Sequence, residues 1–486
     1  MPKCKPNVLN FAANYNIMRR KKREMQLFER VRIIDAGAEG NAVGRVEDKV
    51  VFVPFVVPGD LVDVRAFKNK KSFYEGKTVK IHEYSDKRVE PRCEHFGICG
   101  GCRWQNMKYS EQLFYKRKQV EDSLSRIGKF DYPEVLPIIP SEKEFYYRNK
   151  LEFTFSNKRW LAGSEKEDDP SARNMNGLGF HIPGMFDRIV NLENCYLQEE
   201  PSNSIRRALK QYVDEHSLEY FDTKKNTGFL RNLLIRNTST GEVMVIVVVY
   251  YDDQHEIIGL LDFIYDKFPM ITSLMYVVNP KRNDIISDLE VILYKGKDHL
   301  IETMEGLSFK IGPVSFFQTN SLQAYRLYQI AREFADLKGN EIVYDLYTGT
   351  GTIANFIASL AQKVIGIESI PAAIEDAKIN AEINGIDNTI FFAGDITKVL
   401  DDQFIGANGK PDVVITDPPR AGMHEKVVEQ ILKMEPLKIV YVSCNPATQA
   451  RDVALLIPKY KVMKVQPVDM FPHTQHVENV MLLERI

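Results

Sequence analysis

The chain has 486 residues, of which 44% are hydrophobic and 27% are charged, and its formal net charge is −2. This composition excludes a fibrous or disordered protein, and at about 150 residues per domain the length predicts roughly three domains. The longest apolar run, residues 243–251, is far shorter than the roughly 20 residues that a membrane helix needs, so we expect no membrane association.

Residues 1–24 are predicted to form a basic arm. Nine Lys and Arg residues fall within the first 32 positions, against only Glu24 and Glu29. Such a charge run is typical of a segment that binds a polyanionic partner, and equally of a segment that is only solvated. No secretory signal pattern is present. We therefore expect a cytoplasmic chain whose six cysteines are reduced or bound to metal, with Cys4 an ordinary thiol.

Residues 25–84 alternate short β-branched stretches with turn signals such as Pro58-Gly59-Asp60, which predicts a small OB-type β-barrel. Barrels of this size often bind nucleic acid through basic loops and aromatic side chains. The candidate side chains are Lys68, Lys70, Lys71, Phe73, Tyr74 and Lys77. Lysines in such a turn are also commonly just solvated.

Residues 85–320 are predicted to form a central, β-rich domain. A helix ends at a glycine near residue 128, and strand-rich sequence follows from 145 to 310 with one helix near 200–216. The domain also holds four cysteines: Cys93, Cys99, Cys102 and Cys195. Four thiolates suit a tetrahedral zinc ion or an iron–sulfur cluster. Spacing alone does not separate the two, and we lean slightly to zinc on the residues themselves.

From residue 321 to 486, predicted helices alternate with strands, which is typical of a doubly wound, Rossmann-like α/β domain. The first strand runs into Gly349 and Gly351, and glycines at this turn let the backbone approach a ligand. Glu368 closes the next strand, where an acid would meet ribose hydroxyls, and Asp395 closes the third, where it could bind an adenine amino group.

The third glycine of a dinucleotide-binding fingerprint is absent, because Ala354 follows where that glycine is expected. A nucleoside ligand without a pyrophosphate, S-adenosylmethionine, therefore fits these strand ends better than a dinucleotide does. The fourth strand ends in Asp417-Pro418-Pro419-Arg420. The prolines stiffen the backbone beyond the strand and expose the preceding carboxylate to a planar base. A plain structural turn is the alternative.

Cys444 follows the next strand and Glu478 begins the last one, so a thiol and a carboxylate are predicted in one crevice. A lone cysteine there is more often a small buried hydrophobe. The motifs around it change that expectation. A thiolate that adds to carbon 6 of uracil activates carbon 5 toward a methyl donor, and a base must then remove the carbon 5 proton. Methylation of an amino group needs neither residue.

The motifs DLYTGTGT, DPPRAGM, SCNPAT and HVENV, together with FFQTN at 316–320, resemble those of the RNA uridine-5 methyltransferase family. The resemblance implies that Cys444 is the nucleophile and Glu478 the proton acceptor. It further implies four residues of the cofactor site: Gln318, Tyr347, Glu368 and Asp417. Asp417 and Gln318 would also lie near the target base. Thr352 departs from the family pattern, since some members carry an asparagine at this position.

The resemblance also extends to the other domains. It identifies the barrel at 25–84 as a TRAM domain, and it favours a [4Fe–4S] cluster on the four cysteines, as in the ribosomal-RNA branch of the family. The resulting expectation is a monomeric enzyme that methylates a flipped uridine in a single-stranded or loop region of 23S ribosomal RNA. The alternatives are a transfer-RNA uridine-5 methyltransferase and a non-catalytic RNA-binding or ribosome assembly factor.

Overall fold

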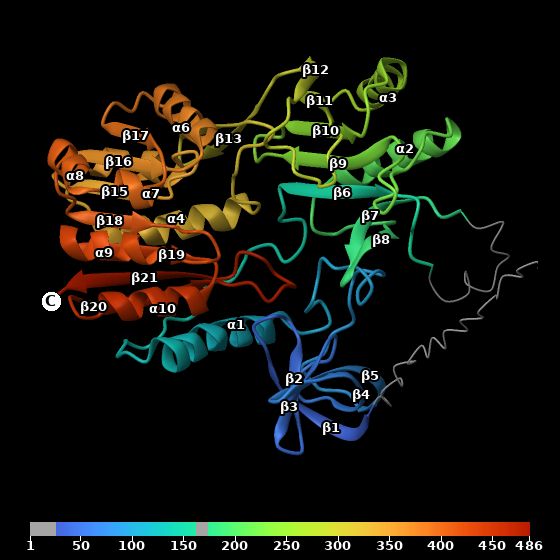
Figure 1. Cartoon of the computed structure of the whole chain (residues 1–486), viewed down its shortest axis with the longest axis horizontal. Helices are drawn as coiled ribbons and strands as arrows, with labels where there is room; N and C mark the ends of the chain where they lie inside the picture. The colour runs from blue at the N-terminus through green and yellow to red at the C-terminus, as the bar shows by residue number, and fades with distance from the viewer. Residues whose placement is uncertain (1–25, 162–173) are drawn as a thin grey trace, which may run out of the picture.

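The computed structural model describes residues 26–161 and 174–486. The chain forms three parts, a barrel, a central sheet and a C-terminal sheet, each with its own core (Figure 1). The basic arm predicted at 1–24, with Cys4, lies outside the described residues. Within the described ranges, no helix is both long and apolar enough to cross a bilayer.

The N-terminal part is the small closed barrel that the sequence predicted, with the strand order β1-β2-β3-β5-β4. Its strands are β1 (Leu27–Ala36), β2 (Ala42–Val46), β3 (Lys49–Val53), β4 (Leu61–Asn69) and β5 (Phe73–Glu83). Alternate side chains such as Val51, Val53, Val62 and Val64 fill the interior, because successive residues of a strand point to opposite faces.

One aromatic residue that was predicted to stack on RNA bases is buried inside the barrel. Tyr74 is only 4% exposed and packs against Phe28 inside the barrel, with ring centroids 4.9 Å apart. Its role as a stacking platform was therefore predicted wrongly. Exposed aromatic side chains of this region include Phe67, on β4, and Tyr84, just after β5, while Phe73 is half-buried.

The central part is a sheet with the strand order β12-β11-β10-β9-β6-β7-β8. Its strands are β6 (Lys150–Ser156), β7 (Gly177–Ile182), β8 (Met185–Asn191), β9 (Leu230–Asn237), β10 (Val243–Val249), β11 (Ser273–Val278) and β12 (Ile292–Gly296). Helices α2 (Ser202–Glu215) and α3 (Gln254–Lys267) pack on one face. Strand β10 is buried along its whole length, which explains why its sequence is uninterrupted by polar residues.

The C-terminal part is the predicted doubly wound sheet, with the strand order β17-β16-β15-β18-β19-β21-β20. Its strands are β15 (Ile342–Leu346), β16 (Lys363–Glu368), β17 (Thr389–Ala393), β18 (Val413–Thr416), β19 (Lys438–Ser443), β20 (Tyr460–Val468) and β21 (Glu478–Arg485). Strands β15 to β19 are parallel, and β21 is antiparallel to both of its neighbours.

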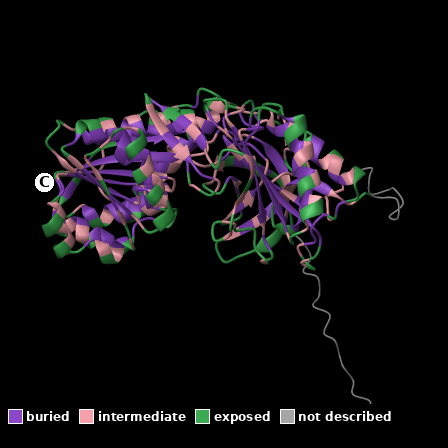
Figure 2. Cartoon of the chain, turned by 90° about the horizontal axis from the view of Figure 1, so that it is seen from above, coloured by how far each residue is buried: buried purple, intermediate pink, exposed green. Residues whose placement is uncertain are grey.

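Helices cover both faces of this sheet. On one face lie α4 (Ser321–Ala335), α5 (Thr352–Ile357), the 3-10 turn Ala358–Leu360 and α6 (Pro371–Ile383). On the other lie α7 (Ile396–Val399), α8 (Asp402–Asn408), α9 (Glu425–Met434) and α10 (Pro446–Leu456). Figure 2 shows the buried strands of the central and C-terminal sheets as two separate cores.

Two segments that precede residue 321 pack on the C-terminal sheet. Helix α1 (Tyr109–Ser123) continues into a π-helical turn (Leu124–Gly128), and Val120 and Leu124 join the core beneath α9 and α10. The hairpin of β13 (Leu300–Met304) and β14 (Leu307–Ile311) packs against α6. Helix α1 therefore bridges the barrel and the C-terminal sheet, as Figure 1 shows.

Candidate active site

Cys444 and Glu478 lie at the same end of two neighbouring strands, Cys444 just after β19 and Glu478 at the start of β21. Strands β19 and β21 are antiparallel, and their last pair in register is Ser443 with Asn479. One step further along the same register lie Cys444, which follows β19, and Glu478, the first residue of β21. The sequence separated these two residues by 34 positions, and the sheet brings them together.

Burial and neighbouring acids keep both groups protonated in the ligand-free protein. Burial, followed by the carboxyl groups of Glu478 and Asp417, raises the pKa of Cys444 to about 11. Glu478 is 4% exposed, and its pKa rises to about 8, first through burial and then through Asp417. The guanidinium of Arg420 opposes both shifts. The thiol and the base must therefore be activated by positive charge that arrives with a ligand or lies nearby.

Hydrogen bonds hold the loop after β18 against the start of α10. Asn445 caps that helix and donates through Nδ2 to the carbonyl oxygen of Arg420 at 3.0 Å. Thr448 donates through its hydroxyl to the same oxygen at 3.2 Å. The amide of Met423 donates to Asp452 Oδ2 at 2.7 Å. These contacts fix Asp417 and Cys444, which sit at the ends of β18 and β19, relative to each other.

The turn after β15 has the backbone that the glycines predicted. Tyr347, Gly349 and Gly351 have φ angles of 63°, 57° and 72°, in the left-handed region that favours glycine. A Cβ atom at Gly351 would lie 2.8 Å from Ala377, so that glycine is required by packing. Open space lies above Gly349, with no atom within 4 Å of the position of a Cβ. A ligand can approach the backbone there.

Two further carboxylates end the adjacent strands. Glu368 Oε2 accepts a hydrogen bond from the amide of Gly349 at 3.3 Å, while Oε1 accepts from Ser369. Asp395 Oδ1 caps α7 by accepting from the amide of Thr397 at 3.0 Å. Because β15, β16 and β17 are parallel, Gly349, Glu368 and Asp395 line one edge of the sheet, in the order expected of a nucleoside site.

Strand β15 also carries, near its end, a buried acid that was not among the predicted site residues. Asp345 is 1% exposed, and burial raises its pKa to about 7. The hydroxyl of Thr348 donates to its Oδ2 at 2.5 Å. Its charge in turn raises the pKa of Asp417 to about 7, after the larger effect of burial. The spacing between Asp345 and Gly349 was the signal that could have identified it.

The remaining predicted residues lie on separate segments, before α4, after β15 and at the start of α5. Gln318 lies in the loop before α4, where its carbonyl oxygen accepts from Asn149 Nδ2 of the central part at 2.9 Å. Tyr347 is half-buried, and burial raises its pKa to about 12. Thr352 is buried at the start of α5, with its hydroxyl 3.3 Å from that of Thr350. Arg420 was quoted only within a motif, yet its charge acts on both Cys444 and Glu478.

The four clustered cysteines line one small cavity between the loop at 93–102 and the segment at 192–197, which follows β8. Gly101 donates its amide hydrogen to Cys99 Sγ at 3.4 Å, and Gln105 donates through Nε2 to Cys102 Sγ at 3.6 Å. Burial raises the pKa of Cys195 to about 11 and that of Cys99 to about 12. As placed, however, no three His, Cys, Asp or Glu side chains in the described part of the chain are arranged to hold a metal ion.

Comparisons with known proteins agree with this geometry. Residues 297–486 match the family model described as tRNA (uracil-5-)-methyltransferase, and residues 28–79 match the TRAM domain. An uncharacterized RNA methyltransferase of Bacteroides thetaiotaomicron is 59% identical over 92% of this chain and 99% of its own length. An uncharacterized RNA methyltransferase of Porphyromonas gingivalis is 55% identical over 93% of this chain and 99% of its own length.

A solved structure is similar over nearly the whole chain. The tRNA (uracil-54, C5)-methyltransferase of Pyrococcus abyssi, crystallised with S-adenosyl-L-homocysteine, superimposes with a TM-score of 0.72 and 30% sequence identity. The match covers 93% of this chain and all of the archaeal one. The likeness thus includes the barrel and the central sheet as well as the C-terminal sheet.

Proposed function

Because this chain belongs to the RNA (uracil-5-)-methyltransferase family, we propose that it transfers the methyl group of S-adenosylmethionine to carbon 5 of a uridine in 23S ribosomal RNA. The observation that carries the proposal is the register that places Cys444 opposite Glu478. A thiol and a carboxyl group at facing positions are the two groups that pyrimidine carbon 5 methylation requires.

The proposed reaction begins at the thiol. Cys444 Sγ, as the thiolate, bonds to carbon 6 of the uracil, and the electron pair displaced from the double bond makes carbon 5 nucleophilic. Carbon 5 then takes the methyl group. Glu478, as the carboxylate, removes the proton from carbon 5. The electrons of that C–H bond restore the ring double bond, and the Sγ–carbon 6 bond breaks to return the thiolate.

The cofactor, when bound, supplies an electrophilic methyl group and a positive sulfonium charge. Gly349 and Gly351 would hold its amino-acid end, Glu368 its ribose and Asp395 its adenine, with Gln318, Tyr347 and Asp417 around the transferred group. The open space at Gly349 and Glu368 Oε2, which accepts a single hydrogen bond, fit these roles. A cation here would favour the ionised forms of Asp417, Glu478 and Cys444, whose pKa values are raised in its absence.

We further propose that Cys93, Cys99, Cys102 and Cys195 bind a [4Fe–4S] cluster. Their gathering around one cavity and the two hydrogen bonds donated to sulfur support it. Binding requires the thiols to ionise and the sulfur atoms to close around the cluster. Zinc is the alternative on the residues alone. Iron content and visible absorption of the purified protein distinguish the two, since zinc gives a colourless protein.

The substrate class has one competing assignment. The similar archaeal structure is a transfer-RNA enzyme, which favours a transfer-RNA substrate for this chain as well. The cysteine cluster, by resemblance, favours ribosomal RNA. Mass-spectrometric mapping of 5-methyluridine in both RNA classes from a deletion strain decides between them. Loss from 23S ribosomal RNA alone, restored by the wild-type gene and not by Cys444→Ala, is the expected result. Loss from transfer RNA alone would assign the other substrate.

A further inference from the structure

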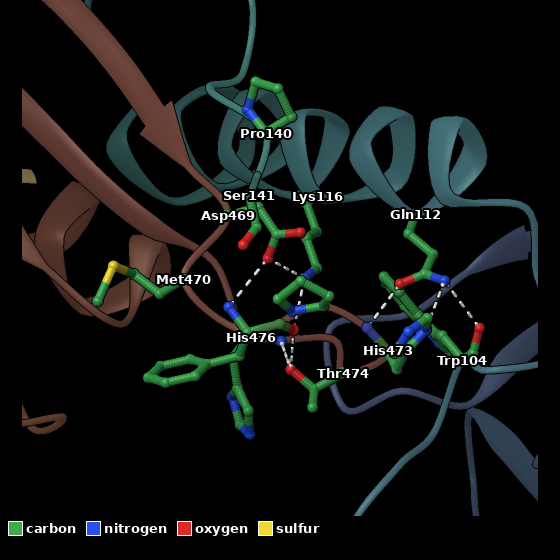
Figure 3. Close-up of polar contacts among 12 residues, drawn as sticks. Trp104, Gln112, Lys116, Pro140, Ser141, Asp469, Met470, His473, Thr474 and His476 are labelled. Carbon is green, nitrogen blue, oxygen red and sulfur yellow. Dashed lines mark hydrogen bonds and ion pairs between the residues drawn. The ribbon is translucent and has the colours of Figure 1, made fainter. Parts of the chain in front are cut away.

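The loop at 469–477, which joins β20 to β21 and leads directly into Glu478, is held by groups from three other parts of the chain. Figure 3 shows its two main anchors: Lys116 points from α1 to Asp469, and Gln112 points from the same helix to His473 and Trp104. The reaction proposed above uses none of these side chains.

The first anchor is a buried ion pair. Lys116 Nζ lies 2.6 Å from Asp469 Oδ1, and both side chains are fully buried. Lys116 also donates to the carbonyl oxygen of Phe471 at 2.9 Å. The hydroxyl of Tyr109 donates to Asp469 Oδ2 at 2.8 Å and accepts from the amide of Ser141. The start of the loop is therefore bonded through both its side chain and its backbone.

The second anchor is His473, whose φ angle is 65°. Its amide donates to Gln112 Oε1 at 2.7 Å, and its carbonyl oxygen accepts from the amides of Arg103 and Trp104 at 2.9 and 3.0 Å. Its ring lies against that of Phe145, with centroids 4.3 Å apart. Arg103 directly follows Cys102, so the cysteine segment forms one wall of this anchor.

Other bonds to the loop come from the catalytic side. Asn320 Nδ2 donates to the carbonyl oxygen of Met470 at 2.9 Å, and Gln323 Nε2 donates to that of Asp469 at 2.8 Å. Both residues belong to the start of α4, just after Gln318. In contrast, Glu478 has no ion pair of its own among the described residues. Its position is set by β21 on one side and by this loop on the other.

We propose that the loop at 469–477 positions Glu478 for removal of the carbon 5 proton, and that Lys116, Asp469, Gln112 and His473 are positioning residues for that step. This inference rests on the proposed function, because it takes Glu478 as the base. A buried ion pair costs desolvation and often contributes little net stability. Here the ion pair fixes the loop that leads into β21, whose first residue is Glu478.

The test uses an intermediate that accumulates only when proton removal fails. Without a working base, the methylated uracil keeps its carbon 5 proton, so the Sγ–carbon 6 bond cannot break and the RNA stays attached to the protein. Glu478→Gln is the reference variant for this adduct, detected with unmodified RNA on a denaturing gel. The test variant is Lys116→Met with Asp469→Asn, which removes both charges and leaves neither one buried alone.

The double variant is expected to accumulate methylated adduct as Glu478→Gln does. Its turnover should fall by about 10²-fold, as misplacement of a catalytic group by about 1 Å can cause. The KM values for RNA and S-adenosylmethionine should stay near those of the wild type. The matched control is Lys158→Met with Asp222→Asn, an ion pair in the central part that should give no adduct. A second variant, Gln112→Leu, loosens the other anchor without touching a charge.

The outcomes separate the two proposals. If Glu478→Gln itself gives no adduct, the assignment of Glu478 as the base is overturned, which is a failure of the proposed function. If Glu478→Gln gives the adduct while both folded anchor variants lose turnover without it, the loop does not position the base and the inference is overturned. Folding is checked by thermal melting and by cofactor binding. If the double variant does not fold, the adduct formed by Gln112→Leu is compared with that of Glu478→Gln instead.

Discussion

Cys444 and Glu478 lie one register step beyond the pair Ser443 and Asn479, at the open end of the β19–β21 ladder. Facing residues on antiparallel strands have Cβ atoms about 5 Å apart. A uracil ring bound at this end of the sheet can therefore contact the thiol with carbon 6 and the carboxyl group with the proton on carbon 5. The pairing of β19 with β21 brings the nucleophile and the base together, and the loop at 469–477 adjoins Glu478 on the other side.

Replacing Cys444 with alanine should abolish methyl transfer. The reaction then has no group that can activate carbon 5, and loss of a covalent nucleophile typically costs more than about 10⁴-fold in rate. Cofactor binding should persist, because Gly349 and Glu368 are untouched. The measurement is transfer of labelled methyl groups to RNA, with trapping on 5-fluorouridine-containing RNA as a second readout. Turnover by Cys444→Ala near the wild-type rate would contradict the covalent route.

Replacing Arg420 with alanine should shift the pH dependence of the reaction. Its charge lowers the pKa of both Cys444 and Glu478. Removing it raises both values, so the acidic limb of kcat/KM moves to higher pH, and the loss of activity is larger at pH 7 than at pH 9. Arg420→Lys should keep most of the wild-type profile. An equal loss at all pH values would instead identify Arg420 as a contact for RNA phosphate alone.

The fold was predictable because its signals are local. Alternating strands and helices, glycines at strand ends and the apolar stretch of β10 each follow from neighbouring residues. The edge that gathers Gly349, Glu368 and Asp395 follows from the same alternation, since parallel strands end on one side. Antiparallel pairing of the last strand was needed to place Glu478 beside Cys444, and only the structure supplies that register.

The anchors of the catalytic loop could not be read from the sequence. Lys116 and Asp469 are 353 positions apart, and a single lysine on a helix gives no sign that it will be buried. The prediction that Tyr74 stacks on RNA bases was wrong for a related reason. The strand period puts it and Phe73 on opposite faces of β5, but which face is inside depends on how the barrel closes.

Replacing Lys116 alone with methionine should destabilise the protein. Asp469 would remain fully buried without its partner, and breaking a buried pair from one side typically costs about 3–5 kcal/mol. The added change Asp469→Asn should recover much of that loss. Thermal melting of the single and double variants measures both effects. Equal melting temperatures for the wild type and Lys116→Met would show that the pair does not hold the loop.

The barrel should bind RNA through Phe67 and the exposed lysines of the β4–β5 loop. Replacing Lys70 and Lys71 with alanine removes two charges, so affinity should fall and the slope of log K against log salt should decrease by about 1.4 for single-stranded RNA. Phe67→Ala should weaken binding through lost stacking by about 1–3 kcal/mol. Tyr74→Phe is the matched control, because that ring lies inside the barrel. A greater loss from Tyr74→Phe than from Phe67→Ala would contradict this assignment.

Glu478 should contribute stability to the ligand-free protein that is lost as the pH rises from about 4.5 to about 8. The pKa of Glu478 is about 8 in the folded chain and 4.5 as its ordinary value. Between these values the folded state holds a proton that the unfolded state has released, so the free energy of unfolding falls with increasing pH. Asp417, with a pKa of about 7, acts in the same direction.

Glu478→Gln should therefore flatten this dependence, because the amide stays neutral throughout. Melting temperatures measured at pH 5 and pH 8 should differ less for this variant than for the wild type. Glu429→Gln, on the exposed face of α9, should leave the wild-type difference unchanged. Saturating S-adenosylmethionine should also reduce the difference, since its positive charge favours the carboxylates that alkaline pH produces. The same difference between pH 5 and pH 8 for Glu478→Gln as for the wild type would mean that Glu478 ionises normally, and the need for ligand charge to activate it would disappear.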